Sequence, residues 1–84
     1  MYYNYVLQSE KDGKRYTGFT NNLERRLKEH NMGLNKSTKF RRPFKLIYYE
    51  VCGSKRDAIN REKYLKTMWG SNYLNKRLTN FFKN

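Results

Sequence analysis

A glutamate stands among apolar residues in the segment from residue 55 to residue 69. If this segment forms a helix, Glu62 occupies the middle of an apolar face whose other members are Ala58, Leu65 and Trp69. A carboxylate in such a place needs a cation, a metal ion or a proton, because burying an unpaired charge is costly. Glu62 is therefore a candidate metal ligand, and an ion pair with a neighbouring lysine or arginine is the alternative.

An arginine and the only histidine form a second candidate group. Arg26 and His30 are four residues apart, which is one turn of a helix, so both side chains can reach a common point. Arg26 can clamp a phosphate with two donors, and His30 can form a hydrogen bond or move a proton. The alternatives are a solvated helix charge for Arg26 and a position at the edge of the core for His30.

The chain is rich in tyrosine, with eight in 84 residues. Those where the first two strands are expected include Tyr3, Tyr5 and Tyr16. A tyrosine in a strand is usually a packing residue with a solvated hydroxyl. The functional alternatives are stacking on nucleic-acid bases, or a phenol that takes a proton from water when a cation lowers its pKa.

The first half of the sequence predicts a β-hairpin followed by a helix. Residues 2–8 and 14–19 are rich in aromatic and β-branched types, and Asp12-Gly13 between them is a turn signal. Residues 23–31 show a helical pattern, and the polar residues 20–22 offer side chains that can cap its N-terminus.

The second half predicts one strand and two helices. Residues 44–51 form the clearest strand pattern, and Ser54 begins a helix over 55–69 that Gly70 stops. Ser71 then caps a last helix over 72–82. The order β-β-α-β-α-α predicts an α+β fold in which helices pack on an antiparallel sheet, and we expect one domain spanning residues 1–84.

Positive charge dominates the composition. Nineteen lysines and arginines against seven acidic residues give a formal net charge of +12. Nucleic acid is the expected partner, because each neutralised phosphate releases counterions. A membrane surface is not expected as the partner, because the charge spreads over every segment instead of one amphipathic helix. The predicted loop over 32–43 carries the residues that we expect to contact phosphates: Lys36, Lys39, Arg41 and Arg42.

Several kinds of chemistry are excluded by what the sequence lacks. It has no P-loop, dinucleotide-binding, zinc-protease or EF-hand motif. One cysteine, Cys52, cannot form an intramolecular disulfide or a usual structural zinc site, and a single thiol suits a reducing cytoplasm. Without an apolar run that could span a bilayer or a signal-peptide pattern, we expect a cytoplasmic protein. Any metal should be a hard, oxygen-liganded cation such as Mg or Mn.

The candidate residues fall in the register of the GIY-YIG endonuclease family, which the chain resembles over essentially its whole length. Asn4-Tyr5-Val6 stands for the first half of the family motif, and Tyr16-Thr17-Gly18 for the second. Arg26 follows Tyr16 at the spacing of the family arginine, with His30 one turn later. Glu62, within AINREKYLK, matches the metal-binding glutamate. The sequence departs from the family where the Gly-Ile of the first half-motif is missing and where Thr17 replaces Ile, and neither side chain does chemistry.

This resemblance implies a small three-stranded antiparallel sheet flanked by helices and hydrolysis of a phosphodiester with one divalent cation. It implies that Glu62 holds the metal and that Arg26 neutralises charge on the phosphate. Tyr5 or Tyr16 would act as general base or position the attacking water, and His30 would assist by hydrogen bonding. Gly18 is expected to let the backbone turn between strand and helix without a side chain crowding the site. The family also places an asparagine on the last helix, for which Asn75 is preferred over Asn72.

Two functions are consistent with these features. The first is a divalent-metal-dependent endonuclease acting on DNA, a chemistry that serves DNA repair among other processes. The second is a non-catalytic nucleic-acid-binding protein that retains the fold. A domain of this size has little surface for choosing a target, so a protein partner that supplies specificity is also expected.

Overall fold

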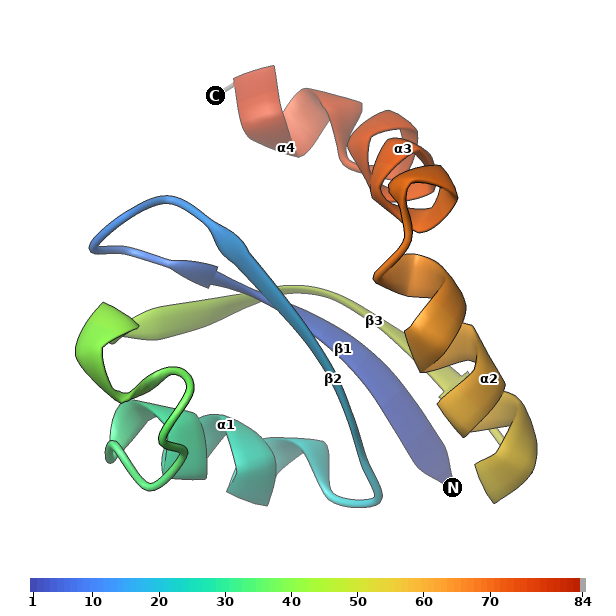
Figure 1. Ribbon diagram of the computed structural model, residues 1–84, viewed down its shortest axis with the longest axis horizontal. Coiled ribbons are helices and arrows are strands. Elements are labelled where there is room, and N and C mark those ends of the chain that lie inside the picture. The colour runs from blue at the N-terminus through green and yellow to red at the C-terminus, as the bar shows by residue number, and fades with distance from the viewer. Residues whose placement is uncertain (84) are drawn as a thin grey trace.

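A β-hairpin opens the chain, as the sequence predicts. In the computed structural model, which describes residues 1–83, strand β1 (Tyr2–Ser9) pairs antiparallel with β2 (Arg15–Thr20) (Figure 1). The turn closes through a 2.9 Å hydrogen bond from the Gly13 backbone N–H to the Ser9 carbonyl. Gly13 has a φ of 72°, a left-handed conformation that favours glycine.

The third strand makes β1 the centre of the sheet. Strand β3 (Phe44–Cys52) pairs antiparallel with β1, so the order is β2-β1-β3. A register shift between Val6 and Leu7 marks a bulge. Tyr5 therefore lies between Gly18 on one neighbouring strand and Tyr49 on the other. The prediction of an α+β fold with a three-stranded antiparallel sheet is confirmed.

Helix α1 (Leu23–Asn31) covers one face of this sheet. The Asn22 side chain caps it by accepting a 3.0 Å hydrogen bond from the Arg25 backbone N–H, which confirms the expected start. Leu23 and Leu27 pack against a buried cluster of Tyr5, Leu7 and Phe44. A loop containing a short 3-10 helix (Lys39–Arg41) then leads to β3.

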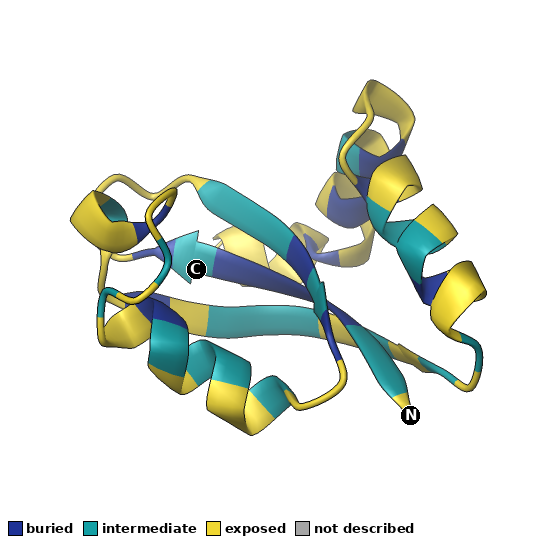
Figure 2. Ribbon diagram, turned by 60° about the horizontal axis from the view of Figure 1, so that its bottom comes forward, coloured by how far each residue is buried: buried dark blue, intermediate teal, exposed yellow. Residues whose placement is uncertain are grey.

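Three helices follow on the other face: α2 (Lys55–Leu65), α3 (Met68–Arg77) and α4 (Thr79–Lys83). Ser54 caps α2 by accepting a hydrogen bond from the Asp57 backbone N–H. Leu65 and Leu74 are buried and pack against Val6 of β1. Figure 2 shows that buried residues run along the central strand. The clusters of Tyr5 and of Val6 lie on its opposite faces, because neighbouring residues of a strand point to opposite sides.

The predicted boundary between the last two helices is wrong. Helix α2 ends at Leu65, and Thr67 caps α3 by accepting a 3.2 Å hydrogen bond from the Gly70 backbone N–H. Gly70 lies inside α3 instead of stopping a helix, because a Cβ there would overlap the Tyr64 carbonyl and the Leu65 backbone. Trp69 consequently leaves the apolar face of α2 and is 74% exposed.

The apolar stripe expected on the last helix is also shorter than predicted. Leu74 and Leu78 are buried, but Phe81 lies on the separate helix α4 and is exposed. No helix within residues 1–83 has the length and apolar character needed to cross a bilayer.

Candidate active site

The hydroxyl of Tyr5 is the meeting point of the candidate side chains. Tyr5 is 1% exposed, and its hydroxyl lies 3.0 Å from Nε2 of His30. It also accepts a 3.3 Å hydrogen bond from Nε of Arg26. The structure thus brings strand β1 and helix α1 together at one phenol, as the one-turn spacing of Arg26 and His30 predicts.

The positions of the protons in this network are assigned from the contacts of Thr38, which lies on the other side of His30 from Tyr5. Nδ1 of His30 lies 2.8 Å from the Thr38 hydroxyl, and that hydroxyl donates to the Asn35 carbonyl at 3.5 Å. We assign the tautomer in which Nδ1–H donates to Thr38 and Nε2 accepts from Tyr5, because it leaves the Thr38 proton for the Asn35 carbonyl. The proton of Tyr5 therefore points at a neutral imidazole.

Burial keeps both rings uncharged at neutral pH. Burial raises the pKa of Tyr5 to about 12, although the neighbouring Arg26 opposes that rise. Burial and the positive charge of Arg26 lower the pKa of His30 to about 4. His30, for which a position at the edge of the core was the alternative to a functional role, is completely buried.

The guanidinium of Arg26 is held on two sides. Nη1 donates to Oε1 of Glu29 at 3.0 Å while Nε donates to Tyr5. Burial works against the charged form, but these two hydrogen bonds outweigh it and raise the pKa of Arg26. A guanidinium has five N–H donors, so further donors are left for a phosphate after these bonds are made.

Gly18 makes room for the Tyr5 ring. It faces Tyr5 across the β1–β2 pair, and a Cβ at this position would overlap the Tyr5 hydroxyl. The expectation of a turn at Gly18 is wrong, since the residue lies inside β2. Its lack of a side chain serves the close approach of the phenol instead.

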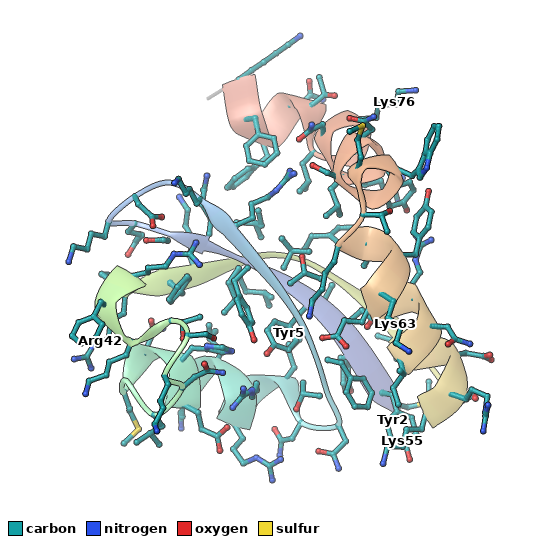
Figure 3. All side chains as sticks on the ribbon, viewed as in Figure 1. Tyr2, Tyr5, Arg42, Lys55, Lys63 and Lys76 are labelled. Carbon is teal, nitrogen blue, oxygen red and sulfur yellow. The ribbon has the colours of Figure 1, made fainter. Side chains whose placement is uncertain are left out.

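Figure 3 shows Tyr5 between α1 and α2, and Glu62 belongs to α2. Its negative charge is near enough to contribute to the raised pKa of Tyr5. Its side chain is 22% exposed, and Oε2 lies 3.2 Å from Nζ of Lys66. Glu62 therefore forms an ion pair with a lysine, which was the alternative to a role as metal ligand.

A divalent cation would find a sparse protein ligand set here. Residues 1–83 contain no group of three or more His, Cys, Asp or Glu side chains that could hold a metal. Mg²⁺ fits such a site, because it keeps several waters and commonly uses one or two carboxylates together with substrate phosphate oxygens. Glu62 is the residue that would hold it.

Tyr16 joins the cluster through its ring. Its centroid lies 4.9 Å from that of His30 and 6.4 Å from that of Tyr5. Tyr16 is half-buried, so it is more accessible than Tyr5 to a water molecule or a substrate. Both tyrosines of the two half-motifs consequently contact the same imidazole.

Comparison with known proteins shows the family of the chain. The family model described as the GIY-YIG catalytic domain matches residues 1–77. The chain belongs to the GIY-YIG family. This is a family of nucleases, so membership implies endonuclease activity on nucleic acid, and its members generally use divalent metal ions.

Small proteins of this family resemble the chain over most of its length. A UPF0213 protein of Clostridium perfringens is 49% identical over 69 residues, which cover 81% of this chain and 73% of that protein. One from Bacillus licheniformis is 48% identical over 68 residues, covering 80% and 69% of the two chains. The solution NMR structure of a UPF0213 protein of Bacillus halodurans shares 35% identity, with a TM-score of 0.54, and the match covers 88% of this chain and 82% of that one.

One candidate of this GIY-YIG domain lies apart from the cluster. Asn75 on α3 accepts a 2.8 Å hydrogen bond from Nη1 of Arg15, whose side chain alternates with that of Tyr16 and so faces the other side of the sheet. Asn72, the other candidate on α3, is exposed. The structure does not bring Asn75 to Tyr5.

The basic loop of the GIY-YIG domain divides into two kinds of residue. Arg41 pairs with Asp12 at 2.9 Å and lies over the Phe44 ring, so it ties the loop to the hairpin. Lys36, Lys39 and Arg42 are exposed, and Figure 3 shows Arg42 at the outer edge of the molecule.

Sequence reasoning missed three contributors to the site. Glu29 and Lys66 follow Arg26 and Glu62 at spacings of three and four residues, which predict contacts on a helix and could have revealed them. Thr38 is completely buried against His30 but lies in an irregular loop, where no periodicity points to it.

Proposed function

We propose that this chain is a divalent-metal-dependent endonuclease that hydrolyses phosphodiester bonds in DNA. The observation that carries the proposal is the Tyr5 hydroxyl, which contacts Arg26 and His30 within range of the Glu62 charge. A phenol in contact with a guanidinium, with a carboxylate near enough to raise the pKa of the phenol, suits phosphodiester hydrolysis, in which a water proton is removed and charge grows on the phosphate.

Arg26 is the group that stabilises the phosphate. Tyr5 and Glu29 fix its guanidinium before any substrate binds, so little reorganisation is needed when negative charge develops. Glu62 would hold the divalent cation, which would supply Lewis-acid polarisation of the scissile phosphate. Lys66 would compete with the cation for this carboxylate, since its Nζ is paired with Oε2 at 3.2 Å.

The two tyrosines divide the remaining work. Tyr5 positions the Arg26 guanidinium by accepting its hydrogen bond, and it donates a hydrogen bond to His30. The raised pKa of Tyr5 keeps it a protonated phenol in the free protein. Tyr16 is the more accessible phenol, so it is our candidate for orienting the attacking water. His30 fixes both rings, by a hydrogen bond to Tyr5 and by an edge-on contact with Tyr16.

The exposed cations of the loop after α1 are the proposed backbone contacts. Lys36, Lys39 and Arg42 lie in the loop that Thr38 joins to His30. Phosphate contacts from these residues would add affinity without sequence preference.

The deciding experiment is cleavage of labelled single-stranded, duplex and branched DNA at low salt with Mg²⁺, Mn²⁺ or EDTA. We expect metal-dependent cleavage that Glu62→Gln abolishes while DNA binding persists. Glu10→Gln is the matched control, because Glu10 is an exposed carboxylate at the hairpin. Equal cleavage by wild type and Glu62→Gln would contradict the assignment of the metal site.

The second candidate function is non-catalytic binding of nucleic acid. The observation that favours it is that Glu62 is paired with Lys66 and that Tyr5 is kept protonated by burial. This function predicts salt-sensitive DNA binding without cleavage on every substrate and with every metal. Cleavage by the wild type that is lost in Glu62→Gln excludes it.

A further inference from the structure

A groove lies on the face of the sheet opposite the Tyr5 cluster. The groove lies between the turn of the hairpin and the helices α3 and α4, and Figure 1 shows that the turn and these helices are separated in space. The volume of the groove is about 690 Å³. This volume falls within the range of small-ligand sites, roughly 300 to 1,000 Å³. Three cations line it, Lys14, Arg15 and Lys83, and its lining within residues 1–83 includes no carboxylate.

Arg15 is held in place by neutral partners. Its Nη1 donates to Oδ1 of Asn75 and its Nη2 to the Ser71 hydroxyl, each at 2.8 Å. These bonds fix the guanidinium, and no carboxylate of residues 1–83 forms an ion pair with it. The acid nearest along the chain, Asp12, is instead paired with Arg41 at 2.9 Å.

An aromatic ring completes the groove. The Arg15 guanidinium lies 5.5 Å from the centroid of the Phe82 ring, and Phe82 is 39% exposed. A fixed cation beside an exposed aromatic ring matches the two parts of a nucleotide, since the cation can bind the phosphate and the ring can stack on the base.

We propose that this groove is a second nucleic-acid subsite, which holds one nucleotide of the substrate strand away from the scissile bond. Arg15, with Lys14 and Lys83, binds the phosphate, and Phe82 stacks on the base. The inference rests on the proposed function, because it takes nucleic acid as the substrate. It also gives Asn75 a role: the residue positions Arg15 instead of acting at the Tyr5 cluster.

The position of the groove has a consequence for the substrate. Arg15 and Tyr16 are adjacent in β2 and point to opposite faces, so a strand that occupies both sites must pass around the edge of the sheet. Short oligonucleotides can therefore fill only one of the two sites.

The test is the salt dependence of binding, measured by fluorescence anisotropy with labelled thymidine oligonucleotides in EDTA. Arg15→Gln should weaken binding about tenfold, because a hydrogen bond to a charged group contributes on that order. It should also reduce the slope of log Kd against log salt by about 0.7, the value for one phosphate of a single strand. Arg56→Gln is the matched control, since it removes an exposed arginine beside Lys55, at the far end of the molecule from the groove (Figure 3). Equal effects of the two substitutions on affinity and slope would overturn the subsite.

A second measurement uses the unaltered protein, in case Arg15→Gln fails to fold. Titration with a long oligonucleotide should shift the NMR amide resonances of Ser71 and Asn75. Unchanged resonances at saturation would overturn the proposal, and so would equally tight binding of thymidine monophosphate, which would make the groove a site for a free nucleotide. Because no readout here depends on cleavage, a failure of the nuclease function would be seen separately.

Discussion

The Tyr5 phenol has its properties because of what surrounds it. Its ring fits against the bare backbone of Gly18, its oxygen accepts from Arg26, and its proton points at His30. Each neighbour contributes something that a tyrosine in a strand does not have by itself: space, an adjacent positive charge and a neutral acceptor. Changes at these neighbours should therefore alter the site without touching Tyr5.

His30 should make the stability of the protein depend on pH. Its pKa is about 4 in the folded state and about 6.5 in the unfolded state, so the unfolded state binds the proton more readily as the pH falls. The free energy of unfolding should decrease by about 2 kcal/mol between pH 7 and pH 5. His30→Gln should be less stable at pH 7 and lose most of this slope. Urea unfolding of both proteins across this range tests the prediction, and an unchanged slope in the variant would contradict it.

Gly18→Ala should disturb both folding and activity. The added methyl group overlaps the Tyr5 hydroxyl, and overpacking of this kind costs about 1 to 3 kcal/mol. Gly53→Ala is the matched control, because a Cβ there meets no atom within 4 Å. Urea unfolding and DNA cleavage should show losses for Gly18→Ala alone. Equal stability of the two variants would mean that Tyr5 can move aside without cost.

Lys66→Gln should lower the metal concentration needed for cleavage. Lys66 competes with a divalent cation for Glu62, but it is 53% exposed, and an exposed ion pair one helical turn apart contributes only about 0.3 to 0.5 kcal/mol. The Mn²⁺ concentration for half-maximal cleavage should therefore fall about twofold. A rise in that concentration would instead indicate that Lys66 helps to bind the substrate or the metal.

At the scale of the elements, local signals explain what the sequence predicted and what it did not. Asp12-Gly13, the Asn22 cap and the Ser54 cap act within a few residues, so the hairpin, α1 and the start of α2 could be predicted. The boundary between α2 and α3 could not, because Gly70 resembles a helix stop but is required by packing against the Tyr64 carbonyl. That contact exists only after α2 and α3 have met.

The true cap of α3 can be tested directly. Thr67→Ala removes the side chain that accepts from the Gly70 backbone N–H at 3.2 Å, and loss of an N-cap costs about 1 kcal/mol. Thr67→Ser keeps the hydroxyl and should stay near the wild-type stability. Thermal or urea unfolding of the two variants distinguishes them, and an equal loss in both would assign the effect to the Thr67 methyl group.

At the scale of the whole molecule, the sequence predicted the participants of the site better than their arrangement. The spacing of Arg26 and His30 and the register of the two tyrosine motifs bring these residues together as expected. Asn75 was assigned to this group, yet the alternation of β2 carries its partner Arg15 to the opposite face. Which face of the sheet α3 covers depends on the packing of Leu65 and Leu74 on Val6, and no local pattern encodes that contact.

The net charge of +12 should make the fold more stable in salt. Mutual repulsion of the cations destabilises the compact state, and added ions screen it. Raising KCl from low to moderate concentration should raise the midpoint of urea unfolding. A lower midpoint would show that ion pairs such as Arg41–Asp12 contribute more to stability than the repulsion removes.

Thr38 connects the loop after α1 to the phenol through His30, in two hydrogen bonds of 2.8 Å and 3.0 Å. A ligand that prefers an arrangement of this loop in which Thr38 leaves His30 must therefore change the proton affinity of Tyr5. Thermodynamic reciprocity requires the converse, that ionising the phenol changes the affinity of the loop for that ligand by the same factor. Binding of a ligand to the loop and ionisation of Tyr5 are therefore coupled equilibria, and measuring either one reports on the other.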